Sequence, residues 1–114
     1  MPAIRLKPIV LALALLTSVA SAARAAENET IVLRFENHHF TPTQLSVAAG
    51  KPLVIQVENA SAETIEFESF KLNREKSIAP GHKVTIRLPA LQPASYDFYD
   101  DFHQDVPEGT IVAK

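Results

Sequence analysis

Residues 80–98 read PGHKVTIRLPALQPASYDF and contain the pattern that best predicts the fold. A Pro80-Gly81 turn precedes the stretch from Lys83 to Leu88, in which every second residue is apolar. Tyr96 and Phe98 repeat this alternation further along the chain. Side chains alternate between the two faces of a β-strand, so a period of two predicts strands with one buried face. This region therefore predicts two short strands.

The same alternation recurs on both sides of this region. The other expected strands are residues 31–35, 44–48, 53–57, 64–68 and 111–112. No segment from Thr30 onward sustains a helical period of 3.6 residues. Short strands separated by turns predict an all-β fold, namely a Greek-key β-sandwich of seven to eight strands.

The first 25 residues are arranged like an export signal. Arg5 and Lys7 precede an apolar run at residues 9–16, and Ala23-Arg24-Ala25 resembles a cleavage site. The run is shorter than the roughly 20 apolar residues of a transmembrane helix. We expect a cleavable signal peptide at residues 1–25, a single domain at residues 26–114 and a periplasmic location, with no membrane span after cleavage. An uncleaved N-terminal anchor is the alternative.

Charge and sulfur content narrow the function. The net charge is −2, and loss of the three basic residues of the signal would leave −5. Such a chain lacks the basic surface that nucleic acid requires. The three glycines form no phosphate-binding loop. Cysteine is absent and Met1 is the only methionine, so any metal bound by residues 26–114 must be held by oxygen or imidazole nitrogen.

Two groups of residues are candidate metal ligands. Glu66 and Glu68 lie two apart in a predicted strand, so their carboxylates share one face, although a solvated outer face would show the same pattern. The second group lies near the last predicted strand and comprises Asp97, Asp100, Asp101 and His103. Like charges this close repel one another unless a cation or hydrogen bonds compensate. The bland alternative is a hydrophilic loop with Asp-mediated turns.

The remaining histidines give weaker signals. His38 and His39 are adjacent, so their side chains should point apart, and no more than one should reach a shared site. Surface histidines are common, which favours a solvent-exposed role for both. Neither Ser69 nor Ser95 has a plausible base nearby in sequence, so no nucleophilic catalytic arrangement is indicated.

Several motifs together resemble the cupredoxins, over essentially the whole chain after residue 25. They are Phe40–Gly50 (FTPTQLSVAAG), Val57-Glu58-Asn59, Pro80-Gly81, and Ser95–Tyr99 (SYDFY) with His103. In blue-copper cupredoxins the metal is held by a histidine after the Asn-bearing strand, and by Cys, His and Met in the last loop. By this resemblance, those places are filled here by Glu66, Asp100, His103, and Glu108 or Thr110.

This departure from the blue-copper pattern changes the expected chemistry. Blue-copper electron transfer needs a thiolate and a weak thioether, so it is excluded. Carboxylates favour Fe(III), and with histidine they also accept Cu(II). The EFE motif at residues 66–68 and the DDFH motif at residues 100–103 are similar to the cupredoxin-like domain of periplasmic iron-uptake proteins of the EfeO type, here in a stand-alone version.

The resemblance implies a metal-binding protein of a bacterial iron-uptake system. It would bind iron, copper or both, and its partners would be an iron permease system and a periplasmic iron-binding protein. The expected ligands are Glu66, Glu68, Asp97, Asp100, Asp101 and His103, with His38, His39 and Glu108 as possible additions. Whether iron is oxidised or only bound stays open. The alternatives are a Cu(II)-binding or copper-delivery module and a metal-free sandwich that docks a partner.

Overall fold

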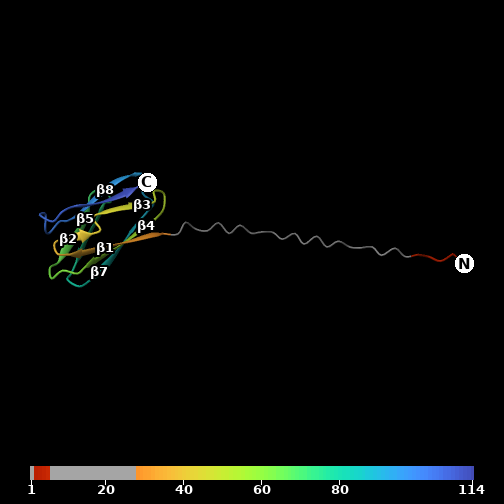
Figure 1. The fold of residues 1–114 in the computed structure, drawn as a ribbon, viewed down its shortest axis with the longest axis horizontal. Helices are drawn as coiled ribbons and strands as arrows, with labels where there is room; N and C mark the ends of the chain where they lie inside the picture. Colours follow the sequence, from red (N-terminus) through yellow and green to blue (C-terminus); the bar gives the residue numbers. More distant parts are fainter. Residues whose placement is uncertain (1, 6–27) are drawn as a thin grey trace.

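The computed structural model describes residues 2–5 and 28–114. In this part of the chain it contains nine β-strands and no helix (Figure 1). No helix among these residues could therefore cross a membrane. The predicted signal peptide lies largely outside the described residues. The strands are β1 (Glu29–Glu36), β2 (His39–Thr41), β3 (Gln44–Val47), β4 (Leu53–Asn59), β5 (Ile65–Ser69), β6 (Arg74–Ile78), β7 (Lys83–Leu88), β8 (Ala94–Asp100) and β9 (Gly109–Ala113).

The strands form two sheets. The four-stranded sheet has the order β2-β1-β4-β7, and the five-stranded sheet has the order β3-β9-β8-β5-β6. The pairs β1–β4 and β3–β9 are parallel, whereas the other pairs are antiparallel. Two parallel neighbouring strands need a crossover connection, whereas all neighbours in a simple meander are antiparallel and joined by hairpins. The predicted all-β sandwich is confirmed.

Aromatic side chains fill the centre of the core between the sheets. Phe40, Phe67 and Phe98 are each 0% exposed. The ring centroids of Phe67 and Phe98 are 5.5 Å apart in a stacked arrangement, and Phe40 meets both rings edge-on. Such contacts add to the free energy gained by burying apolar surface. Phe67 thus anchors β5 and leaves its neighbours Glu66 and Glu68 on the opposite face of the strand.

Two strands were not predicted from the sequence. Strand β2 has only three residues, and β6 reads REKSI, in which three consecutive side chains are exposed. Strand β6 is an edge strand, and charged residues are typical of edges because they discourage pairing with other chains. It lacks an alternating apolar pattern for that reason. The count is therefore nine strands instead of seven to eight.

Candidate metal centre

Strand β5 places two carboxylates on the outer face of the five-stranded sheet. Ile65 and Phe67 are both 0% exposed and face the core. Glu66 and Glu68 alternate with them, so they point the other way. Glu66 is nevertheless only 7% exposed, and Glu68 is half-buried. The predicted convergence of these two carboxylates on one face is therefore present.

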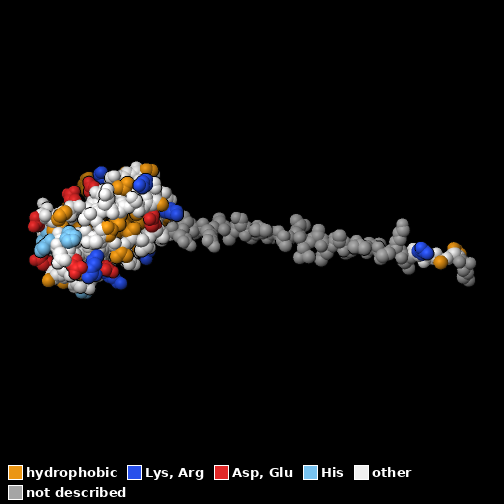
Figure 2. Space-filling model, in the orientation of Figure 1, with side chains coloured by type: hydrophobic (Ala, Val, Ile, Leu, Met, Phe, Trp, Pro, Cys, Tyr) orange, Lys and Arg blue, Asp and Glu red, His pale blue; other side chains and the backbone are white. Residues whose placement is uncertain are grey.

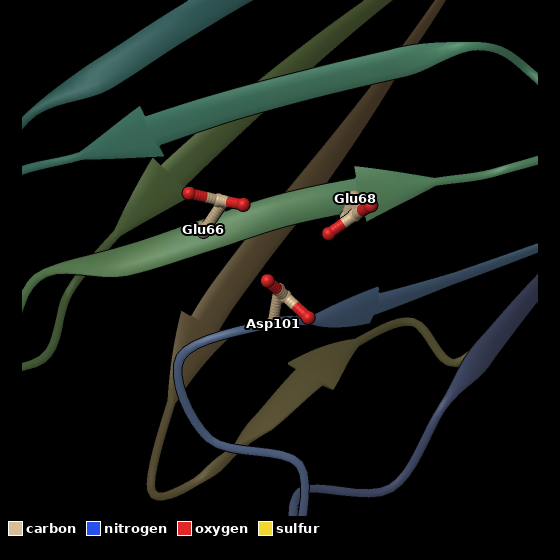
Figure 3. Close-up of side chains that lie close together, drawn as sticks. All are labelled: Glu66, Glu68 and Asp101. Carbon is tan, nitrogen blue, oxygen red and sulfur yellow. The ribbon is translucent and has the colours of Figure 1, made fainter.

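Asp101 joins this pair from the end of β8. Strand β8 runs antiparallel to β5, with Asp100 opposite Phe67. One residue later, the amide of Asp101 donates a hydrogen bond of 2.9 Å to the carbonyl oxygen of Glu66. One carboxylate oxygen from each of Glu66, Glu68 and Asp101 lies within 4.8 Å of the others, and Figure 3 shows Asp101 directed toward the strand that carries both glutamates. We call these three residues the carboxylate cluster.

Strand neighbours extend the polar surface around the cluster. Glu75 and Ser77 on β6 lie opposite Glu68 and Glu66, and the Ser77 hydroxyl donates to Glu66 Oε2 at 3.4 Å. Tyr99 on β8 lies opposite Glu68. Sequence reasoning missed Glu75 because it did not predict β6. Tyr99 could have been found, since it shares strand parity with Asp97 and Asp101.

The cluster is electrostatically unfavourable in the absence of a cation. Burial raises the pKa of Glu66, and the nearby carboxylates of Glu75, Asp101 and Glu68 raise that pKa further. Burial and the charge of Asp101 likewise raise the pKa of Glu68, against a smaller lowering effect of its hydrogen bond with Tyr99. Like charges disfavour one another's ionised form. The charged groups that act most on both glutamates are themselves acidic, so a bound cation would relieve the repulsion.

Asp100 is fully buried and serves a different purpose from its neighbour Asp101. Its Oδ1 accepts hydrogen bonds from the amides of Glu66 and Phe102, at 2.9 Å and 3.1 Å. Its Oδ2 lies 2.7 Å from Nδ1 of His103. Both oxygens therefore have hydrogen-bond partners within the protein, as buried carboxylates require. The structure does not place Asp100 in the carboxylate cluster.

His103 lies between two carboxylates that are not in the cluster. Its Nδ1 contacts Asp100, and its Nε2 lies 2.9 Å from Oε2 of Glu63 in the β4–β5 loop. These partners raise the pKa of His103, chiefly through the hydrogen bond to Asp100. Sequence reasoning missed Glu63 as a partner of His103. No sequence pattern pairs Glu63 with His103, because a tertiary contact brings them together.

The other candidate residues lie apart from the carboxylate cluster. Asp97 accepts a hydrogen bond of 2.9 Å from the Thr110 hydroxyl. His38 is exposed in the turn between β1 and β2, and His39 is exposed at the start of β2. Glu108 lines a shallow depression of about 350 Å³ that Tyr99 also lines. The cluster thus unites three of the six principal candidates.

The turn that contains His38 has a simple backbone cause. Asn37 and His38 have positive φ values of 53° and 59°, and they link strands that pair Glu36 with His39. Two consecutive left-handed residues form the tight turn that matches the twist of a hairpin. His38 lines a groove of about 370 Å³ together with Glu63. Figure 2 shows histidine side chains beside acidic ones at this end of the domain.

Comparisons with known proteins agree with this architecture. Over 82 residues the chain is 33% identical to "Uncharacterized protein RP394" of Rickettsia prowazekii (strain Madrid E), which covers 72% of this chain and 66% of that protein. Among solved structures, the fold is similar to auracyanin A, a "blue" copper protein from Chloroflexus aurantiacus. That likeness has a TM-score of 0.65 and 16% identity, and it covers 77% of this chain and 100% of auracyanin A.

A second structural neighbour is also a copper protein. It is the metal binding domain of the Cu(I) exporting P-type ATPase CopA from Streptococcus pneumoniae D39, with a TM-score of 0.63 and 16% identity over 79% of this chain and 98% of that domain. Likeness at such low identity shows the fold alone. Residues 9–113 match the family described as the cupredoxin-like domain. The chain belongs to the cupredoxin-like domain family.

Proposed function

We propose that this chain is an exported metal-binding protein of a bacterial iron-uptake system. Iron is its cargo, and Glu66, Glu68 and Asp101 are the ligands. The observation that carries this proposal is the convergence of three carboxylate oxygens within 4.8 Å on one sheet face. Bound iron would be presented to an inner-membrane permease, either directly or after oxidation with the help of a periplasmic partner.

The chemistry of the cluster favours a hard cation. All three side chains offer charged oxygen, the donor type that suits hard ions in the way that it suits Mg²⁺, Ca²⁺ and Mn²⁺. Two of the three residues are half-buried, so a cation held there would keep coordination positions open toward solvent. Open positions suit a protein that must release its cargo to a partner.

The donor set does not fit a blue-copper centre. The chain contains no cysteine, and its one methionine is Met1. A thiolate and a weak axial thioether give blue copper its electron-transfer properties. His103 follows β8, and both of its ring nitrogens face carboxylates. The chain therefore cannot supply the thiolate ligand on which blue-copper electron transfer depends.

A Cu(II)-binding or copper-delivery module is the second candidate. The copper proteins among the structural neighbours favour it. In that case, binding would depend on His103, His38 or His39 more than on Glu66 and Glu68. Copper would also be preferred over iron, since Cu(II) stands highest among divalent ions for nitrogen and oxygen donors.

Export and partners rest on the sequence. A basic segment, a short apolar run and Ala23-Arg24-Ala25 favour export to the periplasm. An inner-membrane iron permease system and a periplasmic iron-binding protein are the proposed partners. If oxidation takes place, each Fe(II) gives one electron to an acceptor such as a stoichiometric Cu(II). Comparing the rate of Fe(II) loss with and without Cu(II) tests this role, and a rate no faster than buffer would remove it.

Calorimetric titration of the purified protein with Mn(II), Fe(III)-nitrilotriacetate and Cu(II) tests the proposed function. The Glu66→Gln/Glu68→Gln double variant removes two cluster carboxylates. Its matched control is Glu36→Gln/Glu58→Gln, which removes two carboxylates that contact Arg34 on the other sheet. Stoichiometric Mn(II) and Fe(III) binding that only the first variant loses would support iron as the cargo. Copper binding that both variants retain would instead favour the copper module.

A further inference from the structure

Asp100 and Asp101 are adjacent, but their carboxylates lie in opposite environments. Asp101 is half-buried and belongs to the carboxylate cluster. Asp100 is 0% exposed, and its two oxygens contact three polar groups of the protein. A buried carboxylate is costly unless it is hydrogen-bonded, and this one is fully satisfied. The hydrogen bonds of Asp100 therefore have a purpose other than membership of the carboxylate cluster.

Two hydrogen bonds tie the end of β8 to Glu66. The amide of Glu66 donates to Asp100 Oδ1 at 2.9 Å, and the carbonyl of Glu66 accepts from the amide of Asp101 at 2.9 Å. Both backbone groups of Glu66 are therefore bonded to two consecutive residues. The same Oδ1 accepts from the amide of Phe102, which lies on the other side of Asp101. Asp101 is thereby held between two fixed residues and beside Glu66.

The second oxygen of Asp100 is also fixed. His103 Nδ1 lies 2.7 Å from Oδ2, and its Nε2 lies 2.9 Å from Glu63. His103 therefore links the loop after β8 to the loop before β5. We call Asp100, His103 and Glu63 the clasp. The clasp joins the two segments that carry the cluster ligands.

We propose that Asp100 is the positioning residue of the carboxylate cluster, and that His103 and Glu63 hold Asp100 in place. This inference rests on the proposed function. Residues that orient metal ligands without touching the metal typically change affinity 10–100-fold when they are replaced. Asp100 sets the register in which Asp101 faces Glu66 and Glu68.

Affinity for Mn(II) tests the positioning role, with the purified protein at 25 °C and well below its unfolding temperature. We expect Asp100→Ala to weaken Mn(II) binding by about 10–100-fold. Asp100→Asn should weaken it less, because its side-chain carbonyl can still accept from the Glu66 and Phe102 amides. Asp105→Asn is the control, since it removes the same charge from an exposed position in the loop that follows β8 and should leave affinity within about threefold.

The electron paramagnetic resonance spectrum of bound Mn(II) supplies a readout that a loss of stability alone would not change. Altered ligand geometry should broaden this spectrum in Asp100→Ala, and to a smaller extent in Asp100→Asn. If Asp100→Asn and Asp100→Ala both fold and show the Mn(II) affinity and Mn(II) spectrum of the wild type, the positioning role is overturned. If Asp100→Ala does not fold, an unchanged Asp100→Asn has the same meaning. Absence of Mn(II) and Fe(III) binding in the wild type would instead contradict the proposed function itself.

Discussion

The carboxylate cluster and the clasp are built from neighbouring residues, yet they solve the problem of buried charge in different ways. In the clasp, Asp100 is fully buried and is matched by two amides and His103. In the cluster, the strongest charged influences on Glu66 are other carboxylates, and its pKa is raised. The first arrangement is complete within the protein, and the second is not.

This difference distinguishes carboxylates that stabilise the fold from carboxylates that are available to a ligand. Hydrogen bonds within the protein compensate a buried carboxylate, so such a carboxylate contributes to stability. Carboxylates that face one another reduce stability unless a ligand binds between them. Proteins commonly sacrifice some stability in this way at functional sites. Substitution of Asp100 in the clasp should therefore lower the free energy of unfolding, whereas substitution of the glutamates in the cluster should raise it.

The largest expected effect is the loss of protein stability when the clasp is disrupted. Asp100→Ala leaves the buried amide of Glu66 without a partner and removes the carboxylate beside His103. We expect a loss of about 3–5 kcal/mol in the free energy of unfolding, because the hydrogen bonds of a buried carboxylate to two amides and to the partly buried His103 are lost together, and each unsatisfied group costs roughly 1–3 kcal/mol. Urea denaturation monitored by circular dichroism measures it. Asp105→Asn should change stability by less than about 0.5 kcal/mol, and an equally small loss in Asp100→Ala would contradict the role of the clasp.

The second effect concerns the cluster, where one double variant should bind metal more weakly and yet be more stable without metal. Glu66→Gln/Glu68→Gln should weaken Mn(II) binding by at least about 100-fold, or roughly 2.7 kcal/mol. The same variant should raise the urea midpoint of the metal-free protein at pH 7, since it removes two carboxyls whose pKa values are raised by burial and repulsion. Calorimetry and denaturation test the two outcomes separately. Lower metal-free stability would show that these carboxylates are structural.

The sandwich and the shared face of Glu66 and Glu68 could be predicted from the sequence, because both follow from alternation along a strand. Glu66 and Glu68 share a face since Ile65 and Phe67 are in the core. Asp101 was also predicted, from its place near the end of an expected strand. These predictions needed only local periodicity and the position of a strand end.

The division of labour between Asp100 and Asp101 could not be predicted. It depends on the pairing of β8 with β5, which places the Asp100 carboxylate against the amide of Glu66. The contact between Glu63 and His103 likewise joins loops 40 residues apart in sequence. Edge strand β6 has a charged sequence without alternation, so Glu75 was missed as a neighbour of the cluster. Tertiary contacts, rather than local patterns, determine all three.

The third expected effect is on the dependence of stability on pH. The folded-state pKa values of Glu66 and Glu68 lie above their ordinary value of 4.5, so the folded protein binds more protons than the unfolded chain above that pH. Their contribution to stability is therefore lost as pH rises from 4.5 through the folded pKa values. The pKa of His103 is raised above 6.5, so its contribution is present below pH 6.5 and is lost as pH rises through its folded pKa.

Variants assign these two pH ranges to the two regions. Urea denaturation from pH 4 to pH 9 measures the free energy of unfolding. In the wild type, the contribution of the cluster to it should decline as pH rises from about 4.5, and this decline should be smaller in Glu66→Gln/Glu68→Gln. His103→Gln should reduce only the decline above pH 6.5. Equal pH profiles in all three proteins would contradict the separate titration of the cluster and the clasp.

The smallest expected effect concerns Glu75, which lies beside the cluster on β6. Glu75 lies opposite Glu68 and raises the pKa of Glu66. If it acts only through its charge, Glu75→Gln should weaken Mn(II) binding less than about tenfold, because the Coulomb interaction of a surface group is small in water. The measurement is the same calorimetric titration. A loss as large as that in the double variant would make Glu75 a fourth ligand.

Calorimetric titration of the purified wild type and the Glu66→Gln/Glu68→Gln variant with Mn(II) and Fe(III)-nitrilotriacetate is the decisive measurement of hard-cation binding at the carboxylate cluster. We expect stoichiometric binding by the wild type and at least about 100-fold weaker binding by the variant, which corresponds to roughly 2.7 kcal/mol. The Glu36→Gln/Glu58→Gln control should bind both ions as the wild type does. No binding of either ion by the wild type, or equal binding by the wild type and the variant, would contradict a hard-cation site at Glu66, Glu68 and Asp101.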